Sequence, residues 1–173
     1  MGFGDTSVLC KVVFILLILC FIIDLIAFAI PFWYSLEYNV LGASVKSYGG
    51  LWDACAESGS LKSCASIKDS GLTDWFRAVR AFSILSWLFF LGALVVAIVF
   101  MFFMSGNKLL YLVAVCLSFA GAFCAMIAFA VYAGKLGITD YSASFALTII
   151  SFILGLIIGV LGILDYLGII GGK

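Results

Sequence analysis

The sequence predicts an integral membrane protein, mainly α-helical, in which four transmembrane helices carry one small, disulfide-linked β-sheet. Three observations lead to this prediction. The 173 residues are 66% hydrophobic and only 10% charged, whereas a soluble domain usually has about 25% charged residues. Four apolar runs each exceed 20 residues, and one long polar segment separates the first two runs. Two cysteines lie within that polar segment.

The composition also argues against several classes of function. The chain has no histidine, so it lacks His-based metal sites and the usual Ser-His and Cys-His nucleophile pairs. Its formal net charge is zero, so the overall charge gives no attraction to nucleic acid. We therefore expect no enzyme activity, no cofactor, no metal and no nucleic-acid partner; the expected surroundings are the lipid bilayer.

The four apolar runs fit the thickness of a lipid bilayer. At about 1.5 Å rise per residue, each run can cross a hydrocarbon core of about 30 Å. An even number of spans places both termini on one side, and we treat residues 1–173 as a single tetraspan domain. The predicted spans are 12–32, 81–104, 109–133 and 143–164, with a long loop at 33–80 and a short loop at 134–142 on the other side.

The cysteines of the long loop decide the orientation. The positive-inside rule points weakly in the opposite direction, because the long loop holds most of the basic residues. Cys55 and Cys64 are close enough in the sequence to form a bridge, and a disulfide persists only in an oxidising compartment. We therefore predict a Cys55–Cys64 disulfide, extracellular loops, cytosolic termini and a place in the plasma membrane.

The long loop has the pattern of strands rather than of helix. Residues 33–38 are rich in aromatic side chains, and residues 44–48 alternate in polarity. Residues 57–60 have turn composition between the two cysteines. The loop has little apolar core, and closing about ten residues with a disulfide stabilises it by about 2.7 kcal/mol. From Gly71 onward apolar residues recur at helical spacing, so we expect the second helix to begin outside the membrane.

Aromatic, glycine, cysteine and arginine residues follow one another through the long loop in a recognisable order. They are Trp33, Gly50, Leu51, Trp52, Cys55, Cys64 and Arg80, with Arg77 as the alternative arginine. This order resembles the claudin-family signature, W…GLW-x2-C-x8–10-C…R, which epithelial membrane proteins, peripheral myelin proteins and calcium-channel gamma subunits share in part. The four-span plan of the whole chain is similar as well.

The resemblance implies a left-handed four-helix bundle capped by an antiparallel extracellular sheet of about five strands, the last from the second extracellular loop. It also implies lateral and head-to-head self-association at cell–cell junctions, and hence a paracellular barrier or ion selectivity. The short loop at 134–142 and the tail at 171–173 depart from the family pattern. They leave a second function open, that of an auxiliary, gamma-like subunit of an ion channel or receptor.

Several loop residues are candidates for assembly. Lys62, Lys68 and Asp69 flank the expected last strand of the long loop, where they either line an ion path or form a solvated rim. Trp33 and Trp52 fit the aromatic belt of a bilayer interface, and we expect them to anchor the sheet on the bundle. An adhesive rim needs exposed apolar side chains, for which the candidates are Leu36, Val40, Leu41 and Ile138.

One carboxyl group lies inside a predicted span. Asp24 is roughly 13 Å below the outer boundary, at about 1.5 Å per residue, and an ionised carboxylate there costs about 2.5–3.5 kcal/mol. We expect it to face the bundle interior in the protonated form, hydrogen-bonded to a hydroxyl such as that of Ser118 or Ser151. A proton or cation site is the alternative interpretation.

Small residues repeat along the fourth span. Ser151, Gly155 and Gly159 lie on one helix face, where small side chains let helices approach closely. We expect this face to pack inside the bundle, the alternative being a dimer contact. The matching small residues of the third span are Ala114, Ser118 and Ala122.

The remaining cysteines and the N-terminal segment give weaker indications. We expect the cysteines inside the spans to be small packing residues; they are Cys20, Cys116 and Cys124. Gly2 and Cys10 are positions where a lipid could attach, and the sequence leaves both possibilities open.

Overall fold

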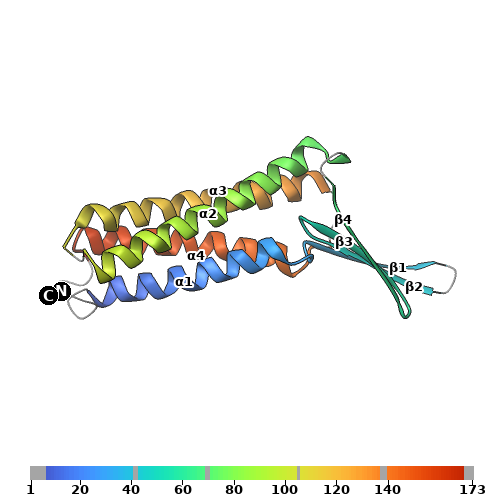
Figure 1. Ribbon diagram of the computed structural model, residues 1–173, viewed down its shortest axis with the longest axis horizontal. Coiled ribbons are helices and arrows are strands. Elements are labelled where there is room, and N and C mark those ends of the chain that lie inside the picture. The colour runs from blue at the N-terminus through green and yellow to red at the C-terminus, as the bar shows by residue number, and fades with distance from the viewer. Residues whose placement is uncertain (1–6, 41–42, 69–70, 105, 137–139, 170–173) are drawn as a thin grey trace.

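The protein is a bundle of four long helices with a four-stranded sheet extending from one end, as seen in a computed structural model (Figure 1). The structure describes residues 7–40, 43–68, 71–104, 106–136 and 140–169. All four helices are long and apolar enough to cross a membrane. The helices are α1 Val8–Ala29, α2 Asp74–Phe102, α3 Lys108–Leu136 and α4 Ala143–Tyr166. The strands are β1 Tyr34–Val40, β2 Ala43–Gly49, β3 Asp53–Ser58 and β4 Leu61–Ser66.

The helices depart from the predicted spans at their ends. α1 begins at Val8, four residues before the predicted span, because the Ser7 side chain accepts a hydrogen bond from the Cys10 backbone N–H at 3.0 Å. It ends at Ala29 rather than at residue 32, since Pro31 forces the residue before it out of the helical region. α2 begins at Asp74, well before the predicted span at 81–104, in keeping with the helical spacing that starts after Gly71.

The bundle closes as a ring in which α1 contacts α2, α2 contacts α3, α3 contacts α4, and α4 returns to α1. Three apolar clusters follow one another along its axis, one in the middle and one at each end. The middle cluster contains Leu17, Phe90, Ala122 and Ile158. At the end opposite the sheet, the Ser7 hydroxyl donates to Asp165 at 2.7 Å, so the start of α1 lies beside the end of α4.

The small-residue face of α4 lies against α2 and α3. A Cβ atom added to Gly155 would lie 2.8 Å from the Ala122 Cβ and 3.0 Å from the Phe90 ring. Gly159 lies directly under the Phe119 ring. Gly162, which the sequence pattern did not include, continues the same face against Val115. The close approach of these helices is therefore made within one chain.

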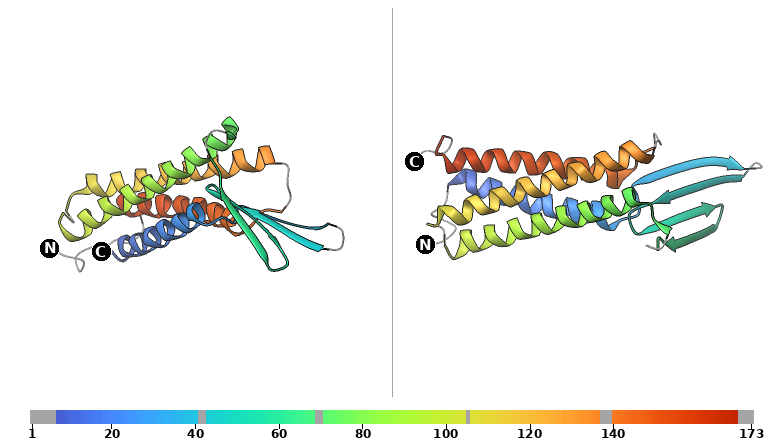
Figure 2. Two further views of the ribbon diagram at one scale, coloured as in Figure 1. Left: turned by 45° about the vertical axis from the view of Figure 1, so that its right-hand side comes forward. Right: turned by 90° about the horizontal axis from the view of Figure 1, so that it is seen from above.

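The sheet is an antiparallel meander in the order β1-β2-β3-β4. Gly59 takes a positive φ of 58° in the tight turn between β3 and β4, a conformation that costs glycine little. The β1–β2 hairpin reaches farther from the bundle than the β3–β4 hairpin (Figure 2). Tyr34 makes an isolated antiparallel bridge with Tyr141, which precedes α4. A fifth strand was expected here, but the described part of the chain has only this bridge. Too few residues precede α4 to extend the pairing.

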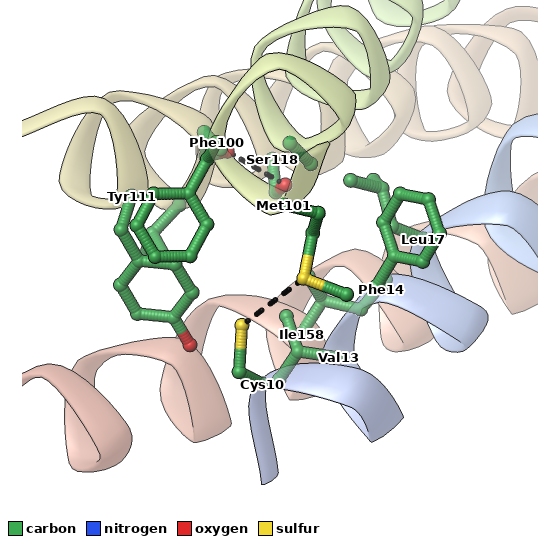
Figure 3. Close-up of a pocket in the computed structure, with 12 residues that line it drawn as sticks. Cys10, Val13, Phe14, Leu17, Phe100, Met101, Tyr111, Ser118 and Ile158 are labelled. Carbon is green, nitrogen blue, oxygen red and sulfur yellow. Dashed lines mark hydrogen bonds between the residues drawn. The ribbon is translucent and has the colours of Figure 1, made fainter. Parts of the chain in front are cut away.

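Two cysteines lie differently from what the sequence suggested. Cys116 is exposed on the outside of α3, because the buried positions on this turn of the helix are taken by Val115 and Ser118. Cys10 is buried, and its thiol donates to the Met101 sulfur at 3.7 Å inside a small apolar cavity of about 20 Å³ (Figure 3). A side chain in this position is turned away from lipid.

The α4 packing yields a first prediction. Gly155→Ala should lower the free energy of unfolding by about 1–3 kcal/mol, because the added methyl group overpacks the contact with Ala122. Thermal unfolding of the purified protein in detergent measures the effect. Gly92→Ala is the matched control: its Cβ would meet only one atom, at 3.7 Å, so this change should be neutral or stabilising. Equal melting temperatures for the two variants would contradict the proposed packing.

Candidate functional site at the junction of sheet and bundle

The chain leaves α1 through a buried tryptophan. Trp33 is fully buried, and its indole N–H donates to the Ala27 carbonyl at 3.0 Å. Ala27 belongs to the last turn of α1, where carbonyl groups have no partner within the helix. The Trp33 ring packs edge-on against Tyr132 of α3 and Phe145 of α4. Trp33 therefore completes the end of α1 and joins three helices.

A second tryptophan, Trp52, binds the next carbonyl of α1 in the same way. The Trp52 indole N–H donates to the Phe28 carbonyl at 2.9 Å, and the two rings meet edge to face with centroids 5.2 Å apart. Trp52 lies in the turn between β2 and β3. Its hydrogen bond therefore ties the middle of the sheet directly to the end of α1.

The turn that carries Trp52 passes very close to the end of α1. A Cβ atom on Gly50 would lie 2.6 Å from the Pro31 Cα and 2.8 Å from the Ile30 carbonyl oxygen. Real Cβ atoms do not make such contacts with backbone, so this position has room only for glycine. Leu51, the next residue, is fully buried in the apolar cluster at this end of the bundle.

Arg80 of α2 holds the other side of the same turn. Its side chain donates from Nε to the Leu51 carbonyl at 2.7 Å and from Nη2 to the Ile67 carbonyl at 3.0 Å. The guanidinium carbon lies 5.0 Å from the centre of the Trp52 ring and 5.3 Å from that of Phe76, within the range of cation–π attraction. Arg80 is 7% exposed, so these contacts are largely shielded from water.

The neighbouring arginine has a different environment. Arg77 is exposed and lies 3.7 Å from the Asp74 carboxylate, one helical turn away. Exposed pairs of this kind contribute little to stability. Of the two candidate arginines, Arg80 is the one seen to bind the Gly50–Trp52 turn, through the Leu51 carbonyl and the Trp52 ring.

The predicted disulfide joins the last two strands. Cys55 and Cys64 are paired directly across β3 and β4 and are bonded to each other. The bond lies within the sheet and links it to no helix. It fixes the β3–β4 hairpin, while Trp33, Trp52 and Arg80 fix the sheet to the bundle.

One face of the sheet carries a row of alternating charges. Glu37, Lys46, Glu57 and Lys62 are direct cross-strand neighbours, one from each strand. Opposite charges in such pairs contribute roughly 0.2–1 kcal/mol each. Interaction of the Lys62 ammonium group with Tyr48, aided by Glu57, raises the pKa of Lys62, so this exposed lysine stays charged at neutral pH.

The opposite face of the sheet carries apolar side chains. Tyr38, Val45 and Leu61 belong to one cross-strand row, in which Ser58 completes the set. Leu61 is 77% exposed and Tyr38 46% exposed. All six residues of β4 are exposed, so the sheet presents an uncovered edge there within the described structure.

The predicted adhesive residues match this surface only in part. Leu36 is half-buried on β1, on the same apolar face. The side chain of Val40 and the residues Leu41 and Ile138 lie outside what the structure describes, as does Asp69. Lys62 and Lys68 are both exposed. Tyr38 and Leu61 were not among the predicted residues, because only the strand register brings them to one face.

The Asp24 carboxyl has one partner that was expected and one that was not. It faces the bundle interior and is 4% exposed, and the Ser86 hydroxyl of α2 donates to it at 3.3 and 3.4 Å. Ser118 instead donates to the Ala114 carbonyl of its own helix at 2.9 Å, an i to i−4 bond that a serine side chain makes readily within a helix. Ser151, the expected partner, does interact with the Asp24 carboxyl, and its hydroxyl also donates to the Leu147 carbonyl of its own helix at 3.1 Å.

The chain matches a known protein family. A sequence model described as the PMP-22/EMP/MP20/Claudin family matches residues 6–162. This range includes all four helices almost to the end of α4, as well as the whole sheet. No individual curated protein matches the chain.

The arginine contact yields a second prediction. Arg80→Met should lower the free energy of unfolding by roughly 2–3 kcal/mol, because it leaves the Leu51 and Ile67 carbonyls without their charged donor. Chemical unfolding followed by tryptophan fluorescence measures the loss. Arg77→Met removes an exposed arginine three residues away and is the control, with an expected change below about 1 kcal/mol. A similar loss in both variants would show that Arg80 has no special role.

The disulfide yields a third prediction. The double change Cys55→Ala and Cys64→Ala should lower stability by about 2.7 kcal/mol, the loop-closure contribution. Either single change should reduce surface delivery more strongly. It leaves an unpaired reactive thiol, and we expect a protein with such a thiol to be retained in the secretory pathway. Surface biotinylation measures how much of each variant reaches the cell surface, and thiol labelling shows whether its cysteines are free. Cys116→Ala, which removes an exposed free cysteine, is the control. Free thiols at both positions in surface-delivered wild-type protein would contradict the pairing.

Proposed function

The chain belongs to the PMP-22/EMP/MP20/Claudin family of multi-pass membrane proteins, and from this premise we propose that it is a claudin-like cell-junction protein. In this role it forms or regulates a paracellular barrier, or its ion selectivity, through self-association and cell–cell contact, without catalysis. The function needs a rigid surface that projects from the membrane and is free to meet other copies. The sheet beyond the bundle supplies it (Figure 1).

The open edge of the sheet is the observation that carries this proposal. Every residue of β4 is exposed, and Leu61 is 77% exposed. Proteins that act alone usually cover, shorten or charge such an edge, because it can pair with another chain. Here the edge holds a single charged residue, Lys62. An exposed edge on a firmly anchored sheet is the arrangement expected of a self-associating protein.

The orientation forms part of the same proposal. The Cys55–Cys64 disulfide requires an oxidising compartment, so the sheet faces the cell exterior. The start of α1 and the end of α4 lie at the opposite end of the bundle, joined by the Ser7–Asp165 hydrogen bond. Both termini are then cytosolic, and the sheet occupies the space between neighbouring cells.

The charge row supports a role in ion selectivity. Glu37, Lys46, Glu57 and Lys62 cross the sheet from one edge to the other, and most of their surroundings are solvent. The row is neutral as a whole, so any selectivity depends on which single charge faces a narrow path, where it favours ions of the opposite sign. Lys62 lies on the open edge strand, where it would face an assembling neighbour or the path between neighbours.

A second function is supported by the reduced second loop. In the described structure, the segment before α4 contributes one bridge, Tyr34 with Tyr141, and two backbone hydrogen bonds, from Ser35 to Asp140 and from Ser142 to Trp33. Contact across the cell gap then depends mainly on the four-stranded sheet. A protein of this shape also fits an auxiliary, gamma-like subunit that binds one channel or receptor and has no need to polymerise.

Expression in cells that lack junctions tests the two functions. A junction protein should concentrate at cell–cell contacts, form intramembrane strands on freeze-fracture, and change the resistance or ion selectivity of a leaky monolayer. Lys62→Glu should alter that selectivity or weaken assembly, since it reverses the charge at the open edge. Lys68→Glu, an equal charge change outside the sheet, is the matched control.

The opposite results would support the auxiliary-subunit function. Diffuse surface protein, unchanged resistance and co-purification with a channel or receptor would contradict the barrier proposal. Identical behaviour of Lys62→Glu and Lys68→Glu in cells that do form strands would contradict the role of the open edge, while leaving self-association itself in place.

A further inference from the structure

A small polar cavity lies inside the bundle, directly below Trp33. Its volume is about 10 Å³, which is room for one occupant the size of a water molecule. Four of its lining side chains carry oxygen, and the others are apolar or aromatic. The oxygen-bearing residues are Asp24 of α1, Ser83 and Ser86 of α2, and Thr148 of α4.

The oxygens surround the cavity without saturating one another. Ser83 is 6% exposed, and its hydroxyl makes no hydrogen bond to any other described group. Ser86 reaches the Asp24 carboxyl only at 3.3 and 3.4 Å, near the long limit for a hydrogen bond between oxygens. Thr148, which lines the cavity, donates its proton to the Ser144 carbonyl at 2.9 Å, so its oxygen can act towards the cavity only as an acceptor or a ligand. The cavity is therefore lined by oxygen atoms with unused hydrogen-bonding capacity, and oxygen is the kind of atom that a small hard cation coordinates.

Among the described residues, no positively charged side chain lines the cavity to neutralise an ionised Asp24. Asp24 is the only charged group among the lining residues. Arg80, one helical turn from Ser83 towards the sheet, directs its guanidinium to the Leu51 and Ile67 carbonyls. An ionised carboxylate at this depth of a membrane protein is unfavourable unless a positive charge lies beside it. A cation would supply that charge and would also give the Ser83 hydroxyl a partner.

We propose that Asp24, Ser83, Ser86 and Thr148 bind a small monovalent cation with the size of Na⁺. The carboxylate supplies the single negative charge, and the three hydroxyl oxygens complete the coordination from α2 and α4. A divalent ion is disfavoured because its sites normally offer more than one carboxylate. Bound at this point, the cation joins three helices and stabilises the end of the bundle from which the sheet projects.

Thermal unfolding of the purified protein tests the site, independently of any junction function. In detergent or nanodiscs, at constant ionic strength, replacing choline chloride with NaCl should raise the melting temperature saturably by a few degrees, because a ligand that binds only the folded state stabilises it by mass action. Replacement with KCl should have a smaller effect. Binding of radioactive ²²Na⁺ to the same samples should saturate near one ion per chain.

Three variants make the test specific. Asp24→Asn keeps the shape of the side chain but should abolish both the Na⁺ response and ²²Na⁺ binding. Ser83→Ala removes one ligand without breaking a hydrogen bond to the protein, and should weaken binding about tenfold or more, the effect of losing one charge-assisted contact. Ser118→Ala removes a buried hydroxyl that does not line this cavity and should bind Na⁺ as the wild type does.

Two results would contradict the proposed cation site. If Asp24→Asn and wild type respond equally to Na⁺, the ion acts elsewhere. If wild type shows no Na⁺ response and no ²²Na⁺ binding, Asp24 is a protonated acid whose cavity holds water, and the proposed cation site does not exist.

Discussion

The structure depends on how the polar groups at the end of α1 are satisfied. The last carbonyls of a helix have no partner within it, and at a membrane boundary such groups are costly if left without one. Two indole N–H groups, from Trp33 and Trp52, reach the carbonyls of Ala27 and Phe28. Arg80 then satisfies two further carbonyls, that of Leu51 in the turn between β2 and β3 and that of Ile67 just after β4. The sheet is attached to the bundle through these long side chains.

This attachment explains why the sheet can remain so open. A small sheet usually needs its own core or a covering layer, and β4 has neither. Its inner end is instead held by buried groups that belong to the bundle, while the Cys55–Cys64 bond fixes the β3–β4 hairpin. Stability is concentrated at the junction, and the outer half of the sheet is left available for contact with other molecules.

Much of this arrangement could be predicted from the sequence. The four helices follow from apolar length alone, and the residues of the junction were found through their order along the chain. Less predictable was how each helix is rotated about its own axis, because the spans are apolar on every side and carry little periodic signal. That rotation decides that Asp24 meets Ser86 rather than Ser118, and that Cys116 faces outward. The apolar face with Tyr38 and Leu61 could not be predicted either. Which face a side chain takes depends on strand register, and the turn between the strands sets that register.

Hydrogen exchange in lipid nanodiscs tests most directly whether the sheet is held at its inner end by the bundle. The amides of Gly50 and Ile67 donate to Asp53 and Trp52 at this junction. They should exchange as slowly as amides in the middle of the helices, and should stay protected after the disulfide is reduced. The amides of the outer β1–β2 hairpin should exchange much faster. If the junction amides exchange as fast as the hairpin, or lose protection when the disulfide is reduced, the sheet is held by its own covalent link and the bundle does not anchor it.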